Sequence, residues 1–280
     1  MQRIGVIGAG TMGHGIAQVC AMAGYDVVLA DADAGVLAKA VQTVQANLAK
    51  GIERGKVTPA DRDAALARLA TGDLARASTG ADLVIEAVPE RLALKQSLFG
   101  EVERHAPASC ILATNTSSLS IAGIASALAD PGRVVGTHFF NPVHIMELLE
   151  VVAAERTRPE VVDAIRTFGA RIGKDVIVVQ DRPGFATSRL GVALGMEAIR
   201  MVEQGVASPE DIDKAMVLGY RHPVGPLKLT DLVGLDVRLN IGEYLARELG
   251  NPAFEPPALM RSMVADGRLG KKSGRGFYDW

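Results

Sequence analysis

The sequence contains little cysteine and carries almost no net charge. Two cysteines, Cys20 and Cys110, in 280 residues are far fewer than a disulfide-stapled secreted domain contains, so we expect two buried, reduced thiols. The 30 lysines and arginines nearly balance the 32 aspartates and glutamates, which leaves a net charge of -2. This balance disfavours a nucleic-acid partner held by bulk electrostatics.

Long apolar runs are missing as well. No run approaches the roughly 18–20 uncharged residues that a membrane-spanning helix needs. The apolar start Ile4–Ile7 breaks into glycines at once and has no cleavage-like stretch behind it, unlike a signal peptide. These absences predict a cytoplasmic protein that does not contact a membrane. At a prior of roughly 150 residues per domain, the length allows two domains or one large one.

Strand-like and helical patterns alternate over the first part of the chain. The apolar runs typical of strands lie at residues 3–7, 26–30, 83–85, 111–113, 134–136, 148–152 and 176–179. Helical spacing is expected over residues 13–23, 36–53, 59–69, 92–103, 121–128 and 158–172. Such alternation predicts a Rossmann-type, doubly wound α/β fold with a mostly parallel sheet that helices cover on both faces.

The pattern changes at Asp181–Gly184, where a Pro-Gly pair punctuates the chain. Beyond it we find no strand, and helices are expected over residues 185–206, from Ser208 onward, and over 227–249 and 258–265. We therefore expect an α/β domain at residues 1–183 and a smaller all-helical domain at 184–280. About 95 residues is small for a core of its own, so we expect this second domain to dock on another copy in a homodimer.

The segment Gly8-Ala9-Gly10-Thr11-Met12-Gly13 matches the G-x-G-x-x-G pattern between a strand and a helix, and it predicts that the domain at residues 1–183 binds NAD. The glycines permit a tight turn, close approach to a pyrophosphate and close helix packing, and the helix N-terminus attracts the phosphates. Asp31, at the end of the next strand, can bind the ribose hydroxyls and repel a 2′-phosphate, which favours NAD over NADP. A glycine turn beside a surface aspartate is the alternative, as is a domain that only binds NAD.

Polar residues that packing does not explain gather between residues 114 and 150. Thr114–Ser118 and His138 each follow a predicted strand, and Glu150 lies within the run 148–152. A histidine with a pKa near ~6.5 can take the proton that alcohol oxidation releases, and a carboxylate can orient its ring. Spacing alone leaves His144 and Glu147 as rivals, and a packed structural histidine remains an alternative.

Several motifs resemble the 3-hydroxyacyl-CoA dehydrogenase family, closest to its single-function bacterial 3-hydroxybutyryl-CoA type, across essentially the whole chain. They are GAGTMGHGIA at residues 8–17, EAVPE at 86–90, NTSS at 115–118, HFFNP at 138–142, PGF at 183–185 and GKKSGRGFY at 270–278. The resemblance implies NAD-dependent interconversion of (S)-3-hydroxyacyl-CoA and 3-oxoacyl-CoA. It makes His138 the general base rather than His144, Glu150 the carboxylate that orients it, and Ser117 a partner of the substrate hydroxyl.

The resemblance also implies binding residues and no metal. The NAD contacts would be Gly8, Ala9, Gly10, Thr11, Met12, Gly13, Asp31, Glu90, Lys95, Ser117, Asn141 and Lys272. The acyl-CoA partner would be met by Ser117 and, at the helical hairpin after the second strand, by Asn47, Arg54 and Lys56. Without the resemblance, Lys95 and Lys272 read as solvated lysines, Glu90 as a helix N-terminal acid, and the hairpin residues as a solvated helix end.

One position departs from the family pattern. The family commonly has Asn where this chain has Ser188, in Pro183-Gly184-Phe185-Ala186-Thr187-Ser188-Arg189. Serine is shorter and lacks the amide donor, so substrate orientation or chain-length preference is expected to differ. Two other functions remain open at this stage: a related dehydrogenase that acts on a free hydroxy acid, and a non-catalytic NAD-binding structural protein.

Overall fold

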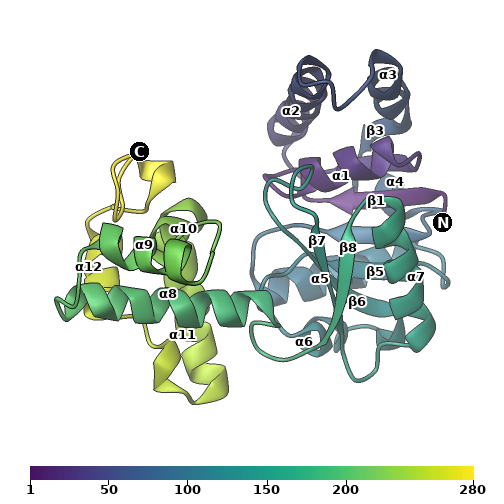
Figure 1. Ribbon diagram of the computed structural model, residues 1–280. Coiled ribbons are helices and arrows are strands. Elements are labelled where there is room, and N and C mark those ends of the chain that lie inside the picture. The colour runs from purple at the N-terminus through teal and green to yellow at the C-terminus, as the bar shows by residue number, and fades with distance from the viewer. The chain divides into compact units, whose positions relative to one another are not determined.

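The computed structural model describes all residues, 1–280, and divides the chain into two compact units. Met1–Asp181 form the first unit and Arg182–Trp280 the second, coloured purple to teal and green to yellow (Figure 1). The division falls beside the Pro-Gly pair Pro183–Gly184. No helix in either unit combines the length and the apolarity that crossing a membrane requires.

The first unit is built on an eight-stranded sheet in the order β3-β2-β1-β4-β5-β6-β7-β8. The strands are β1 Arg3–Ile7, β2 Asp26–Ala30, β3 Leu69–Gly72, β4 Leu83–Glu86, β5 Ile111–Thr114, β6 Val134–Phe139, β7 Leu148–Ala153 and β8 Asp175–Gln180. Neighbours pair in parallel except β6 and β7, which are antiparallel. The predicted doubly wound, mostly parallel sheet is confirmed, with its strand order switching direction between β1 and β4.

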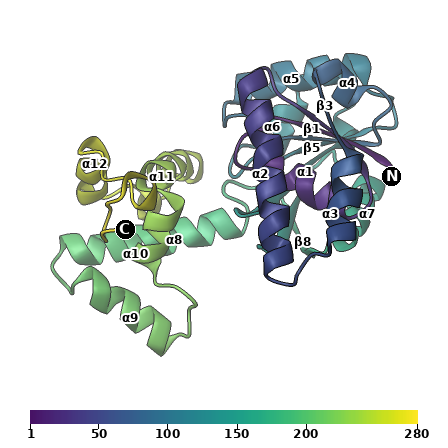
Figure 2. The ribbon, with the colours of Figure 1, turned by 90° about the horizontal axis from the view of Figure 1, so that it is seen from above.

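Helices cover both faces of this sheet. They are α1 Gly13–Met22, α2 Ala34–Glu53, α3 Pro59–Arg68, α4 Leu74–Ser78, α5 Leu92–His105, α6 Ile121–Ala125 and α7 Pro159–Arg171, with a short 3₁₀ turn at Pro131–Arg133. Viewed from above, α4, α5 and α6 lie on one side of the strands and α1, α3 and α7 on the other (Figure 2). The central strands are buried on both faces because of this double cover, which explains their unbroken apolar runs.

Two elements of the first unit were not expected from the sequence. β3 at the sheet edge is only half-buried, and its residues Leu-Ala-Thr-Gly form no apolar run. α4 has five residues, too few to show a helical period. A third difference concerns β6, which continues to Phe139 instead of ending near residue 136, because its ladder with β7 runs that far. His138 therefore lies within a strand.

The second unit is helical, as predicted. Its helices are α8 Thr187–Glu203, α9 Pro209–Gly219, α10 Pro226–Val233, α11 Leu235–Leu249 and α12 Ala258–Ala265, with 3₁₀ turns at Pro252–Phe254 and Lys271–Ser273. The single helix expected over residues 227–249 is wrong, because Gly234 adopts φ 106°, a left-handed conformation that ends α10 and starts α11. Met196, Ile199, Leu227 and Leu245 are among the buried residues of an apolar core within this unit.

A buried carboxylate holds the C-terminal tail onto this core. Asp231 of α10 is 1% exposed. Its two oxygens accept hydrogen bonds from the backbone N–H groups of Phe277 (3.0 Å) and Tyr278 (2.9 Å) and from the indole Nε1 of Trp280 (3.0 Å). One side chain thus fixes the segment that includes the GKKSGRGFY motif.

We expect Asp231→Ala to lower the free energy of unfolding by about 2–4 kcal/mol, because three donors lose a charged acceptor at a buried site. Denaturant titration followed by circular dichroism measures this loss. Asp279→Ala is the matched control in the same tail, since the Asp279 side chain is 90% exposed and its ion pair with Arg275 is long, at 3.6 Å. Equal destabilisation by the two substitutions would show that Asp231 does not hold the tail.

Candidate active site

The glycine segment turns sharply where β1 ends. Gly8 has φ 98°, and a Cβ there would lie 2.7 Å from the carbonyl carbon and oxygen of Ala87, the residue that follows β4. A Cβ on Gly13 would collide with the carbonyl oxygen of Gly8. Around Gly10, by contrast, a Cβ would meet no atom within 4 Å. The backbone is therefore tightly packed below the loop and open above it, as close approach to a pyrophosphate requires.

The N-terminus of α1 follows this loop directly, and no side chain caps it. Its first N–H groups and its dipole form a favourable environment for an anion. Asp31 lies next to the loop, where one carboxylate oxygen accepts from Ala9 N at 2.7 Å and the other from Asp33 N at 3.0 Å. A carboxylate has further lone pairs for ribose hydroxyls. These residues fit an adenine dinucleotide without a 2′-phosphate.

Glu90, Lys95 and Ser117 form one cluster beyond the ends of β4 and β5. Glu90 Oε1 accepts from the hydroxyl of Thr116 (2.5 Å) and from Ser117 N (2.9 Å), and the Ser117 hydroxyl lies 3.3 Å away. Lys95 Nζ is 3.3 Å from Glu90 Oε2. The reading of Lys95 as a solvated surface lysine is wrong, since this side chain is 1% exposed. Glu90 likewise engages the loop after β5 rather than serving only as an acid before α5.

His138 and Glu150 form a buried pair. They lie directly opposite each other on the antiparallel strands β6 and β7, and His138 Nδ1 is 2.9 Å from Glu150 Oε2. His138 is 7% exposed and Glu150 0%. The ring of Phe140 lies 4.4 Å from the imidazole, centroid to centroid. The carboxylate thus fixes the orientation of the ring and favours a proton on Nδ1.

The two rivals, His144 and Glu147, line a different place, a cavity of about 680 Å³ beside α1 and the end of α2. Asn47, Arg54 and Lys56 line the same cavity, together with Lys50, Arg171 and Lys174. Burial and the nearby His14, Lys174 and Arg54 lower the pKa of His144. The hairpin residues are therefore brought together at a cavity with several cations and one acid, which suits a phosphate-bearing ligand.

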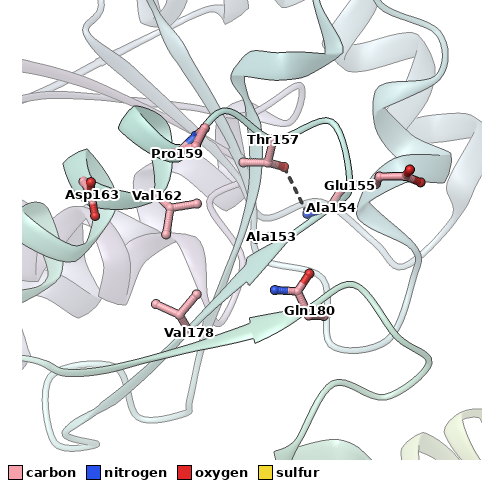
Figure 3. Close-up of a pocket in the computed structure, with 9 residues that line it drawn as sticks. All are labelled: Ala153, Ala154, Glu155, Thr157, Pro159, Val162, Asp163, Val178 and Gln180. Atoms are coloured by element: carbon pink, nitrogen blue, oxygen red, sulfur yellow. Dashed lines mark hydrogen bonds between the residues drawn. The ribbon is translucent and has the colours of Figure 1, made fainter.

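A second hollow, of about 500 Å³, lies between β7, α7 and β8 (Figure 3). Thr157 accepts there from Ala154 N at 3.0 Å, and the acids Glu155 and Asp163 are the charged residues that line it. None of the expected site residues lines this hollow. Its charge also does not suit an anionic cofactor.

Three more residues were singled out from the sequence. Asn141 is exposed in the loop between β6 and β7. Lys272 belongs to the second unit, where its ammonium lies 2.6 Å from Asp236 Oδ2. Ser188 falls in the first turn of α8 in that same unit.

Sequence reasoning missed two polar residues beside the site. Glu86, the last residue of β4, is 0% exposed and contacts Lys95 at 2.6 Å. Asn115 accepts from Phe139 N at 2.9 Å and so ties the loop after β5 to the end of β6. For Glu86 the sequence does contain a signal. A charged residue ends an otherwise apolar strand, where an unpaired charge is strongly disfavoured, so a partner is expected.

A dinucleotide loop at the switch point of a doubly wound sheet, beside a buried histidine–carboxylate pair, defines a Rossmann-type oxidoreductase. The family is also shown by sequence. Residues 3–182 match the model of the 3-hydroxyacyl-CoA dehydrogenase NAD binding domain, and residues 184–280 match that of the C-terminal domain. The chain therefore belongs to the 3-hydroxyacyl-CoA dehydrogenase family.

Similar proteins extend over the whole chain. A 3-hydroxybutyryl-CoA dehydrogenase of Mycobacterium tuberculosis is 43% identical, covering 100% of this chain and 99% of its own length. A probable 3-hydroxybutyryl-CoA dehydrogenase of Bacillus subtilis is 41% identical, with 100% and 98% covered. The crystal structure of (S)-3-hydroxybutyryl-CoA dehydrogenase from Ralstonia eutropha matches with a TM-score of 0.96 at 40% identity, covering 100% of this chain and 99% of that one.

These findings confirm the expected enzyme class and its cofactor. The protein is a dehydrogenase of the 3-hydroxyacyl-CoA class, and its NAD-binding domain identifies the cofactor as NAD. The reading as a non-catalytic NAD-binding protein is set aside.

We expect Asp31→Ser to reduce the preference for NADH over NADPH by at least about tenfold in kcat/KM, because it removes both a ribose hydrogen bond and the repulsion of a 2′-phosphate. Parallel assays with the two cofactors measure the ratio. Asp26→Ser, at the opposite end of β2, should leave the ratio unchanged. An unaltered ratio in Asp31→Ser would remove Asp31 from cofactor selection.

Proposed function

We propose that this enzyme interconverts (S)-3-hydroxybutyryl-CoA and acetoacetyl-CoA, with His138 as the general base. The observation that carries the proposal is the buried pair of His138 and Glu150 at 2.9 Å. Bound NAD would supply the hydride acceptor for the substrate carbon, so the task left to this chain's residues is removal of the hydroxyl proton. The resemblance of the site motifs to the family and the names of the similar enzymes support the same reaction.

The chemistry of His138 follows from its partner. Because Glu150 faces Nδ1, proton exchange with the substrate hydroxyl falls to Nε2. A neutral imidazole accepts that proton, and the adjacent carboxylate stabilises the imidazolium that forms. In the reverse direction the same imidazolium donates the proton to the 3-oxo group.

Ser117 is proposed to hydrogen-bond the substrate oxygen beside His138. Its backbone N–H is fixed by Glu90 at 2.9 Å, which supports a defined position for the hydroxyl. The glycine loop, Asp31, Glu90, Asn141 and Lys272 remain the proposed NAD contacts. Lys95 is dropped from this set, because its ammonium is buried and is engaged by Glu86, Val88 and Glu90. For Lys272 the support is the sequence motif alone.

The CoA moiety is proposed to bind at the cavity of about 680 Å³ lined by Asn47 and Arg54. Asn47 donates to Gln18 at 3.1 Å, and Arg54 is exposed at the C-terminal end of α2. The cations of this cavity can pair with the phosphates of CoA. A homodimer and a cytoplasmic location stay predictions from the sequence.

His138→Ala should lower kcat by about 10²–10⁴-fold for NADH-dependent reduction of acetoacetyl-CoA, since the general acid–base group is gone. Absorbance of NADH measures the rate, and fluorescence titration should show NADH binding retained. His105→Ala, exposed at the end of α5, should keep full activity. Near-normal turnover in His138→Ala would refute the proposed base.

An acyl-CoA substrate predicts far faster turnover of acetoacetyl-CoA than of free acetoacetate. Equal rates on the free acid would instead favour a hydroxy-acid dehydrogenase.

Arg54→Met should raise KM for acetoacetyl-CoA by about tenfold and leave kcat nearly unchanged, because it removes a binding charge remote from the chemistry. Lys39→Met is the control, since Lys39 is exposed on the same helix but lies outside the cavity.

A further inference from the structure

The cluster around Lys95 continues inward to a carboxylate to which none of the proposed steps assigns a role. Glu86 ends β4 at the carboxyl edge of the sheet and is 0% exposed. Its Oε1 accepts from Lys95 Nζ at 2.6 Å and from Val88 N at 2.6 Å, and its Oε2 accepts from the hydroxyl of Thr114 at 2.7 Å. These contacts all come from groups able to donate, as a carboxylate requires.

Lys95 connects this buried carboxylate to the outer one. Its ammonium reaches Glu86 Oε1 at 2.6 Å, the carbonyl oxygen of Val88 at 3.2 Å and Glu90 Oε2 at 3.3 Å. The contacts with Glu86 and Val88 are hydrogen bonds, and the contact with Glu90 is an ion pair. The direction of the lysine is therefore fixed between Glu86 and Glu90.

Glu90 in turn holds the loop that carries Ser117. The backbone N–H groups of Ser117 and Ser118 lie 2.9 and 3.3 Å from Glu90 Oε1, and the Ser117 hydroxyl lies 3.3 Å from it. Glu86 also fixes Val88 N, next to Ala87, whose backbone packs against Gly8 of the cofactor loop. One carboxylate is thus connected to both sides of the site.

We infer that Glu86 is a positioning residue for the dehydrogenase reaction, which acts through Lys95 and Glu90 to hold Ser117 in place. The inference rests on the proposed function, in which Ser117 binds the substrate oxygen. Burial raises the pKa of the Glu86 carboxyl, and the Lys95 ammonium, the Thr114 hydroxyl and Val88 N–H act in the opposite direction. A fully buried ion pair adds little net stability in general, but removing one of its partners is costly, so turnover and unfolding have to be measured separately.

Glu86→Gln tests this role with little change of shape. The amide oxygen can still face Lys95 and Val88 N, and the amide nitrogen can donate to the Thr114 hydroxyl, so only the counter-charge of Lys95 is lost. Lys95 then shifts toward Glu90 and displaces the Ser117 loop. A small misplacement of a reacting group costs up to about 10²-fold in rate, and we expect kcat to fall at least about tenfold.

Thr114→Val is the matched control. It removes the donor at Glu86 Oε2 and leaves the contacts through Oε1 to Lys95 intact. We expect its kcat to stay within about twofold of the wild-type value, because the link from Lys95 to Ser117 is preserved. Thermal unfolding of both variants separates a loss of turnover from a loss of fold.

A double-mutant cycle with Ser117→Ala supplies the readout that a purely structural role would not move. If Glu86 acts through Ser117, Glu86→Gln should change kcat less than about twofold in the Ser117→Ala background. The same tenfold loss in both backgrounds, or a wild-type kcat in Glu86→Gln alone, would overturn the inference. Should Glu86→Gln fail to fold, Glu86→Gln with Lys95→Met removes both buried charges and must show the same loss and the same non-additivity.

Assays of the wild-type enzyme distinguish failure of the proposed function from failure of the positioning role. Absence of NADH oxidation with acetoacetyl-CoA contradicts the proposed function and the positioning role together. Full wild-type turnover combined with an unaffected Glu86→Gln contradicts the positioning role alone.

Discussion

The alignment of strand ends across the parallel sheet is the constraint on which the site depends. Ile7 pairs with Glu86, Glu86 with Thr114, and Thr114 with Gly136, so β1, β4, β5 and β6 are in register at one edge. The cofactor loop, the segment before α5 and the Ser117 loop leave the sheet from this edge. Because a one-residue slip would turn each side chain to the opposite face, the buried register fixes which polar groups meet.

The antiparallel pairing of β6 with β7 brings His138 and Glu150 together beside that edge. His138 and Glu150 are 12 residues apart and still lie opposite each other. A parallel return would need a crossover of a dozen residues or more before the second strand began. The local reversal is thus what allows a short loop to carry a carboxylate back to the imidazole.

Much of the fold and part of the site follow from sequence, and the exceptions have physical reasons. Long apolar runs and the glycine segment identify the sheet and the cofactor loop because burial and backbone geometry leave a local pattern. β3 leaves none, since an edge strand is only half-buried. The burial of Lys95 could not be predicted from the sequence. A buried lysine needs a carboxylate partner, and only the structure shows that Glu86 and Glu90 lie against its ammonium.

The near-zero net charge conceals two different local environments that suit anions. The glycine loop contains no cation and offers backbone N–H groups and a helix dipole, whose geometry is rigid and specific for a pyrophosphate. The cavity at the end of α2 offers lysines and arginines on flexible stems, an attraction that salt screens where the groups are exposed. A ligand whose reacting ring must be placed accurately needs the first kind of site. A long carrier group that lies away from the reacting atoms needs only the second kind of site. The glycine loop and the cavity occupy different places in the first unit, which fits these different requirements.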